Sequence, residues 1–293
     1  MGPHSQHIPK AAGYAVLSAV VYSALSLIVK LIGTQATTDQ VLFARYLIGC
    51  LILLPWAVLR RKELYPVAEP FQLVKRSICS LLSVGCFFYT LRFLPLGNAL
   101  VLYNTYPLFI PVIAWALHKI RTPHKMWIGI ITGFLGVLMI LRPDPESFHP
   151  QSVIGLASGV FAAVALIYVR FMTKTASTFQ ILFYTNFICL LATLALLPFA
   201  GGWPSFFLWD RFAFLGAAGI VYLYFNTLSL AKAPARLVAP IMYLTIALGL
   251  AADYFVWGLL PDGWSFLGIV CIIAGGVLTL VFGQKELKNF SGK

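Results

Sequence analysis

Long apolar runs separated by short polar segments make up almost the whole chain. A helix needs about 20 mostly apolar residues to cross a bilayer. The first run follows a short polar stretch and is too long for the apolar part of a cleaved signal peptide. The pattern predicts an all-α integral membrane protein with ten transmembrane helices, at 11–32, 39–59, 72–92, 96–118, 126–141, 152–172, 178–199, 211–231, 235–259 and 264–283.

The composition agrees with lipid as the solvent of this fold. Hydrophobic residues make up 60% of the 293 residues and charged residues 10%, against about 25% charged residues in a typical soluble domain. The net charge of +12 does not indicate nucleic-acid binding, because the basic residues form no stripe interleaved with aromatic residues. Ten helices also leave no room for a soluble catalytic domain.

The distribution of Lys and Arg predicts the orientation in the membrane. Cytoplasmic loops of membrane proteins carry an excess of these residues. With the N-terminus in the cytoplasm, sixteen of them fall in the inner segments, Lys75 and Arg76 included, and four fall outside. Both termini are therefore expected to be cytoplasmic. A bacterial inner membrane suits such a short, loop-poor chain, and an organelle membrane is the alternative.

An internal repeat divides the chain into two five-helix segments, 11–141 and 151–283. Gln40 opens the second apolar run and Gln180 opens the seventh, an offset of 140. Prolines before the fourth and ninth runs, and glycines in the fifth and tenth, recur at an offset of 139. Because five is an odd number, the second copy must enter the membrane upside down. Inverted repeats are typical of secondary transporters, whose substrate site lies near the midplane between the repeats.

Short motifs in both halves resemble those of one transporter family. They comprise Phe43-Ala44-Arg45 in the second run, residues 90–95 before the fourth, and the glycine-spaced segments 129–141 and 268–280. Together with the repeat, they make residues 11–283 similar to the drug/metabolite transporter superfamily, and to its EamA-type ten-helix permeases in particular.

The resemblance implies transport of metabolites, amino acids or drugs. It also implies a path lined by the first, third, fourth, sixth, eighth and ninth helices, with the fifth and tenth as scaffold. The family often has a Gly-Glu pair near the ends of the fourth and ninth helices. Here Ile120 and Leu259 occupy the glutamate positions, so no role of that glutamate can be carried over.

Three ionisable residues are expected to lie inside the bilayer, where a charge is costly and indicates a functional site. Asp253 shares a helix face with Gly249 and Trp257. It could carry a coupling proton, bind a substrate ammonium group, or pair with one of the two basic residues. Arg45 matches a position where the family commonly has arginine, and either orients the structure or binds a substrate anion. Lys30 either reaches the membrane interface or lines the outer mouth of the path.

Polar and aromatic residues inside the helices are candidates for lining a central cavity. A polar stripe on a membrane helix faces protein or water, and the third and eighth helices carry matching stripes. The alternative is that these side chains form hydrogen bonds that serve packing. Aromatic rings could stack on a substrate or its cation. The candidate substrate contacts are Tyr89, Tyr103, Asn104, Tyr222, Asn226, Tyr243 and Trp257.

Prolines interrupt the fourth and ninth helices. Pro107 frees the carbonyl of Tyr103, and Pro240 frees that of Arg236, because proline has no N–H to donate. Freed carbonyls are tolerated at membrane depth where they line a cavity or find other partners. These prolines are therefore candidates for gating, and a static kink is the alternative.

Nothing in the sequence indicates a cofactor or a metal site. The five cysteines lie inside apolar runs without CxxC spacing, and the five histidines lie in tails, loops or helix ends. No phosphate-binding loop and no hydrolase or metalloprotease motif occurs. An ATP-driven pump is therefore not expected.

These features predict a secondary transporter, and not an enzyme. Its expected substrate is a small polar or zwitterionic, amino-acid-like metabolite, carried by alternating access through a central cavity. The expected partners are that substrate and the lipid bilayer, and the chain is either a monomer or a homodimer. The alternatives are an intramembrane enzyme, which would need a nucleophile–base pair at membrane depth, and a lipid-handling protein or non-transporting membrane subunit.

Overall fold

The computed structural model describes residues 8–64, 69–118, 126–141, 150–173, 175–199, 202–233 and 239–291. Within these ranges the protein is helical and has no strand. Seven helices are long and apolar enough to cross a membrane, and three shorter apolar helices accompany them, at Trp127–Met139, Ile241–Trp257 and Gly263–Leu278. The protein is therefore a multi-pass membrane protein. The number of crossings and the side on which the termini lie stay predictions.

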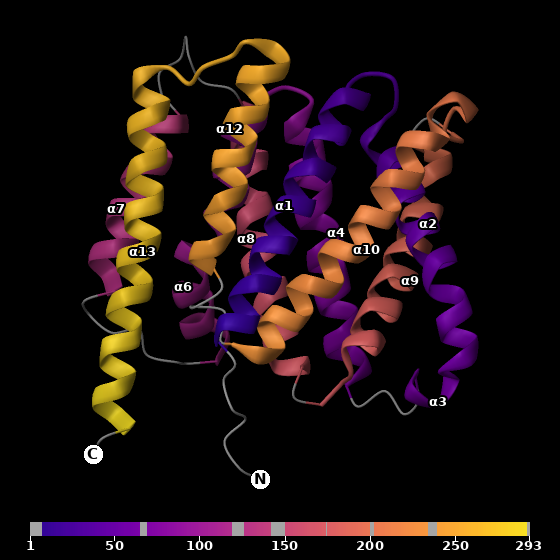
Figure 1. The fold of residues 1–293 in the computed structure, drawn as a ribbon, viewed down its shortest axis with the longest axis horizontal. Coiled ribbons are helices and arrows are strands. Elements are labelled where there is room, and N and C mark those ends of the chain that lie inside the picture. Colours follow the sequence, from indigo (N-terminus) through magenta and orange to yellow (C-terminus); the bar gives the residue numbers. More distant parts are fainter. Residues whose placement is uncertain are drawn as a thin grey trace.

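Each predicted run coincides with helical structure, and only the breaks within runs differ. The elements are α1 (Ile8–Ile32), α2 (Thr38–Leu59), α3 (Arg61–Leu64), α4 (Pro70–Leu91), α5 (Leu96–Tyr103), α6 (Tyr106–His118), α7 (Met126–Leu141), α8 (Pro150–Met172), α9 (Thr178–Leu196), η1 (Leu197–Phe199), η2 (Phe206–Leu208), α10 (Trp209–Lys232), η3 (Ala239–Tyr243), α12 (Leu244–Trp257) and α13 (Gly263–Ser291). The start of α1 and the end of α13 lie on the same side of the molecule (Figure 1).

The fourth predicted helix is not continuous, which corrects the expected span of 96–118. It breaks at Asn104 and Thr105, between α5 and α6. Pro107 cannot donate to the carbonyl four residues earlier. The Asn104 and Thr105 side chains instead bond the carbonyls of Leu100 and Leu102, at 2.7 and 2.6 Å. Side chains that satisfy the backbone in this way compete with the regular helix.

The ninth predicted helix is also irregular at its start. The 3₁₀ turn η3, which contains Pro240, precedes α12, and regular α-helix begins only at Leu244. The carbonyl of Arg236, expected to be freed by Pro240, lies outside the described residues. Both prolines singled out in the sequence therefore lie at interruptions of helices.

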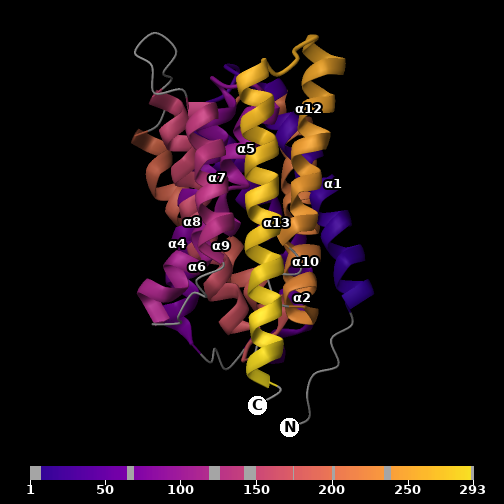
Figure 2. The same cartoon turned by 90° about the vertical axis from the view of Figure 1, so that its left-hand side faces the viewer.

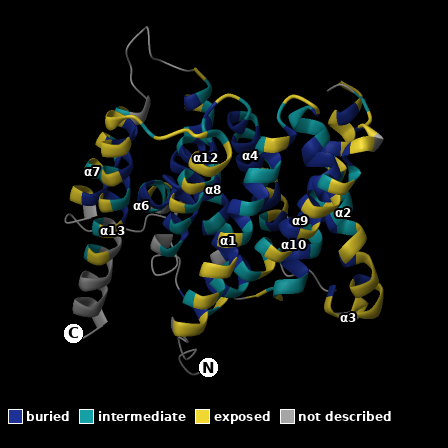
Figure 3. Ribbon diagram, turned by 45° about the horizontal axis from the view of Figure 1, so that its top comes forward, coloured by how far each residue is buried: buried dark blue, intermediate teal, exposed yellow. Residues whose placement is uncertain are grey.

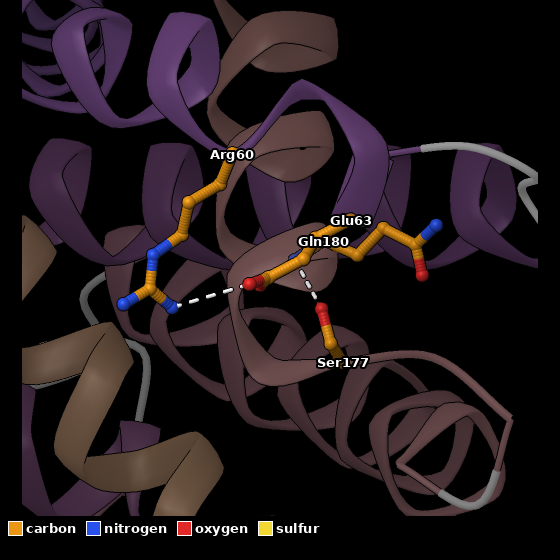
Figure 4. Close-up of polar contacts among 4 residues, drawn as sticks. All are labelled: Arg60, Glu63, Ser177 and Gln180. Atoms are coloured by element: carbon orange, nitrogen blue, oxygen red, sulfur yellow. Dashed lines mark hydrogen bonds and ion pairs between the residues drawn. The ribbon is translucent and has the colours of Figure 1, made fainter.

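The second and seventh predicted helices begin with the same cap. Thr37 Oγ1 accepts from the backbone N–H of Gln40 at 3.3 Å, and Ser177 Oγ accepts from that of Gln180 at 3.1 Å (Figure 4). A hydroxyl at this position satisfies one of the N–H groups that a helix start leaves unpaired. The two caps are separated by the 140-residue offset of the repeat.

The two glutamines also connect opposite halves of the chain. Gln40 Nε2 donates to the Gly202 carbonyl at 3.2 Å, and Gln180 Nε2 donates to the Leu64 carbonyl at 3.0 Å. Gln40 of α2 thus bonds the segment that follows α9, and Gln180 of α9 bonds the segment that follows α2. The second contact lies beside the short helix α3, where Arg60 and Glu63 pair at 3.4 Å (Figure 4). The connection is therefore reciprocal.

Helix packing follows the same exchange of halves. α1 packs on α10 as α4 packs on α8, and α2 packs on α10 as α4 packs on α9. α5 contacts α12, and α7 contacts α13 along their lengths. The α7–α13 pair forms one edge of the molecule, and α2 with α9 forms the opposite end (Figures 1 and 2).

Glycines bring α7 and α13 close together. A Cβ added to Gly275 would meet backbone atoms of Gly129 and Gly133, and one added to Gly136 would meet the Gly268 carbonyl oxygen. Small residues allow membrane helices to approach until their backbones touch. This pair is therefore a rigid support at the edge of the bundle.

The molecule has a buried interior and an apolar exterior. Large apolar side chains are exposed along the outer helix faces, while the dark-blue interior is buried (Figure 3). Exposed faces of this kind are expected where lipid replaces water, because lipid tails solvate leucine and phenylalanine without cost. The interior nevertheless contains polar and charged side chains, which define the candidate site.

Candidate functional site

A small polar cavity lies between the two halves of the bundle. Its volume is about 60 Å³, enough for a few water molecules and far below the ~300 Å³ of a typical ligand pocket. α2, α4, α5, α8, α9 and α10 all contribute to its wall. The polar residues that line it are Arg45, Tyr46, Arg76, Ser80, Ser83, Tyr103, Thr185, Asn186, Tyr222 and Asn226.

Equivalent positions of the two halves meet in this cavity. Arg45 and Thr185 are 140 residues apart, and so are Tyr46 and Asn186. Ser83 and Tyr222, from the two polar stripes, are 139 apart and also line it. Thr90 and Ser229, the last residues of the two stripes, do not line it. Their hydroxyls donate to backbone carbonyls of α4 and α1 instead.

Arg45 is held at the cavity wall by aromatic and glycine contacts. Its side chain is 6% exposed, and its guanidinium lies over the rings of Tyr46 and Phe88, at 5.6 and 5.4 Å from the centroids. It also lies against Gly219, where an added Cβ would come within 2.9 Å of Nε. Arginine stacks well on aromatic faces. Its Nη1 has no hydrogen-bond partner among the described residues.

Arg76 is a second buried arginine that the sequence analysis assigned to the inner surface. The structure corrects this, because Arg76 lies within α4, is 3% exposed and lines the cavity. Its Nη1 donates to Thr185 Oγ1, and its Nε has no partner among the described residues. The position of Arg76 within an apolar run was the feature of the sequence that indicated its burial. Grouping Arg76 with Lys75 as part of a basic loop concealed that indication.

An aromatic cluster covers the cavity. The Tyr22 ring lies 5.1 Å from that of Tyr103 and 4.6 Å from that of Tyr222, and 5.6 Å from Phe87. Tyr22 is completely buried. Tyr103 and Tyr222 were candidates from the sequence, and Tyr22 was not, because nothing in its helix distinguishes it from a packing residue.

Asp253 and Lys30 lie apart from the cavity, where α1, α12 and the start of α5 meet. Both oxygens of Asp253, which is 2% exposed, accept backbone N–H groups: Leu96 at 3.0 Å and Gly97 at 2.6 Å. Lys30 Nζ donates to the Leu94 carbonyl at 2.6 Å. No salt bridge forms between Asp253 and Lys30 or Arg45 within 4 Å, so the ion pair, one of the alternatives from the sequence, is not present, and Asp253 bonds the start of α5 instead.

The remaining sequence candidates are dispersed. Trp257 lies under Lys30, with Nζ 5.2 Å from its ring. Asn104 Nδ2 donates to Thr245 Oγ1 at 2.8 Å and so connects α5 to α12. The hydroxyl of the buried Tyr243 has no partner among the described residues. Tyr89 stacks with the exposed Phe93, 5.0 Å away, outside the cavity wall.

Two larger hollows, of about 400 and 450 Å³, lie on the outer faces of the helices. Their linings are almost wholly apolar, as expected of grooves filled by lipid tails. Among the described residues, no three His, Cys, Asp or Glu side chains gather in a way that could hold a metal ion. The cavity with two arginines is therefore the place where polar chemistry concentrates.

Comparison with known proteins gives relatives along the full chain. An S-adenosylmethionine uptake transporter of Rickettsia conorii is 27% identical over 278 residues, 94% of either chain. A pseudopaline exporter of Pseudomonas aeruginosa is 27% identical over 276 residues, 91% of this chain and 92% of its own. A solved crystal structure shares the fold, with a TM-score of 0.66, 18% identity, and coverage of 94% of this chain and 98% of the other.

A model of one family also matches nearly all of the sequence. It matches twice, at residues 9–142 and 151–281. Both named relatives are transporters, in agreement with the resemblance seen in the sequence. The chain belongs to the EamA-like transporter family, within the drug/metabolite transporters.

Proposed function

We propose that the protein is a secondary transporter of small polar or zwitterionic, amino-acid-like metabolites, and that it works by alternating access. Segments 11–141 and 151–283 are the two inverted repeats, with both termini in the cytoplasm of a bacterium. The reciprocal glutamine contacts and the exchanged helix pairs support this division. Inverted repeats that rock about a site near the midplane are a common design of secondary transporters.

One observation carries the proposal: a buried polar cavity lined by equivalent positions of both halves. A scaffold protein or a subunit has no use for polar groups at this depth, where each one costs free energy. Two halves that rock against each other separate where their equivalent residues meet, which is the place of this cavity. Movement of either half then opens the same residues to one side of the membrane.

The structure corresponds to a contracted state. The cavity of about 60 Å³ is too small for a metabolite, so substrate entry requires helices to move apart. Above it, Leu94 and Leu96 are buried, and the Lys30 and Asp253 hydrogen bonds hold this closed layer. The break at Asn104 and the turn η3 provide places where α5 and α12 can bend.

The names of the relatives suggest which substrates to test. S-adenosylmethionine is an amino acid with an α-ammonium and an α-carboxylate group, and one relative is an uptake transporter for it. Another relative exports pseudopaline. Relatives of similar identity thus move different compounds in different directions, so neither the substrate nor the direction follows from the names alone.

Flux in vesicles tests the proposal. Purified protein is reconstituted into liposomes preloaded with unlabelled S-adenosylmethionine or methionine, and uptake of the labelled compound is followed. We expect saturable uptake that depends on the protein and that internal substrate accelerates. Protein-free liposomes are the control. Absence of protein-dependent flux across a panel of amino acids and nucleoside-containing amino acids contradicts the proposal and favours the enzyme or subunit alternatives.

A further inference from the structure

We propose that the cavity is an oxyanion site, in which Arg45 and Arg76 together bind a carboxylate or phosphate group of the transported molecule. The inference rests on the proposed function, and it specifies the chemistry of the same site. Neither arginine has a carboxylate partner among the described residues.

The first step of the argument is the missing counter-ion. Arg45 and Arg76 are 6% and 3% exposed, and neither forms an ion pair within 4 Å with a carboxylate of the described residues. Asp253, the one buried acid among the described residues, lies apart from the cavity and accepts two backbone N–H groups of α5. A charge taken from water without a partner is strongly unfavourable. Two such charges in one cavity therefore indicate that a negative ligand completes the site.

The second step is that both guanidinium groups serve the same space. Both line the same cavity beside Tyr46 and Tyr222, and each has one nitrogen with no hydrogen-bond partner among the described residues, Arg45 Nη1 and Arg76 Nε. Guanidinium groups match the geometry of carboxylates and phosphates, to which they donate parallel hydrogen bonds. The free donors are suited to such a group.

The third step is that the site is built and not accidental. Thr185 accepts from Arg76 and fixes one edge of it. The rings of Tyr46 and Phe88 fix Arg45, and Gly219 leaves space beside Nε that any Cβ would take. A binding group whose rotamer is held before the ligand arrives loses less entropy on binding.

Thermal unfolding of the detergent-purified protein tests the proposal without any need for transport. The probes are inorganic phosphate, methionine and S-adenosylmethionine, each at constant ionic strength against chloride. Two matched compounds have no carboxylate: methioninamide, in which an uncharged amide replaces it, and decarboxylated S-adenosylmethionine, in which the group is removed. We expect wild type to be stabilised by phosphate or by the carboxylate compounds, and not by their matched partners. Which oxyanion stabilises it distinguishes a phosphorylated from a carboxylate substrate.

Variants locate the effect. Arg45→Gln and Arg76→Gln are expected to weaken binding of the stabilising anion about tenfold or more, the size expected for loss of a charge-assisted hydrogen bond. Gly219→Ala keeps both charges but displaces Arg45, and is also expected to weaken it. Arg211→Gln is the control, since Arg211 donates to Gln35 at the far end of α10.

Two results would overturn the proposal. One is that no carboxylate or phosphate probe stabilises wild type. The other is equal stabilisation of wild type, both arginine variants and Gly219→Ala. Binding is measured in detergent and transport in vesicles, so the two proposals can fail separately. Flux without anion binding would contradict the oxyanion site and support the transporter. Anion binding without flux would support the oxyanion site and contradict the transporter.

Discussion

At the scale of single residues, the charged groups in the interior divide into two kinds. Asp253 and Lys30 form hydrogen bonds with backbone groups at one end of α5, and we propose that they hold this part of the structure. Arg45 and Arg76 line the cavity, and each keeps one donor without a partner among the described residues; we propose that they bind a group from outside the protein. The distinction follows from hydrogen bonds and not from charge, since all four residues are equally unusual inside a membrane.

The capping role of Asp253 predicts how substitutions at this position behave. Asp253→Ala leaves two buried N–H groups of α5 unpaired and should lower the free energy of unfolding by about 1–3 kcal/mol. Asp253→Asn keeps one oxygen acceptor but places its NH2 group against the second N–H, so it should retain only part of the stability that Asp253→Ala loses. Thermal unfolding of both variants beside wild type measures this.

Transport by the same variants separates capping from proton coupling. If Asp253 only holds α5, Asp253→Asn should transport with the pH dependence of wild type. A stable Asp253→Asn protein that loses all concentrative uptake would instead support the proton-carrying role predicted from the sequence.

At the scale of elements, interruptions and close contacts have separate places. The breaks at Asn104 and in η3 lie in the helices nearest the aromatic cluster and the closed layer. The contacts in which glycine meets glycine backbone lie between α7 and α13, at the edge of the bundle. We therefore expect bending in the interrupted helices and little movement between α7 and α13.

The α7–α13 contact predicts a destabilising substitution far from the cavity. In Gly275→Ala the new methyl group meets backbone atoms of Gly129 and Gly133, which cannot move aside as a side chain does. Overpacking of this kind costs about 1–3 kcal/mol, which thermal unfolding can measure. Gly85→Ala is the matched control, because its Cβ would meet only Leu42, at an ordinary 3.5 Å. Equal stability of the two variants would show that the helices separate without cost.

At the scale of the whole molecule, the two halves are related by exchange of equivalent contacts. Thr37 and Gln40 act at one face as Ser177 and Gln180 act at the other. This arrangement agrees with the proposal that the two segments cross the membrane in opposite directions. Equivalent positions of both halves meet at the cavity between them.

The predicted orientation can be measured by labelling in intact cells. Ser205, between α9 and α10, and Thr175, between α8 and α9, are both exposed and lie at opposite ends of α9. A membrane-impermeant maleimide should label Ser205→Cys and not Thr175→Cys, and permeabilised cells should label both. Wild type is the control, since its five cysteines are buried or half-buried. The reverse pattern would place the termini outside.

Local properties of the sequence determined the class of the molecule and its plan. Apolar runs of membrane length require helices, because only internal hydrogen bonds satisfy a backbone in lipid. The positions of Pro107 and Pro240 indicated where helices are interrupted, and the offset of 140 between Gln40 and Gln180 indicated the repeat. These features depend on residues near one another in the chain, so a reader of the sequence can recover them.

Tertiary structure alone decided which polar residues meet. Asp253 caps a helix start more than 150 positions away, and no sequence spacing distinguishes that from an ion pair. Arg76 reads as part of a basic loop until α8, α9 and α10 bury it around the cavity. Tyr22 reads as core until its ring is found between those of Tyr103 and Tyr222. Whether a polar group is paired or left available depends on neighbours from other helices, and only their packing determines those neighbours.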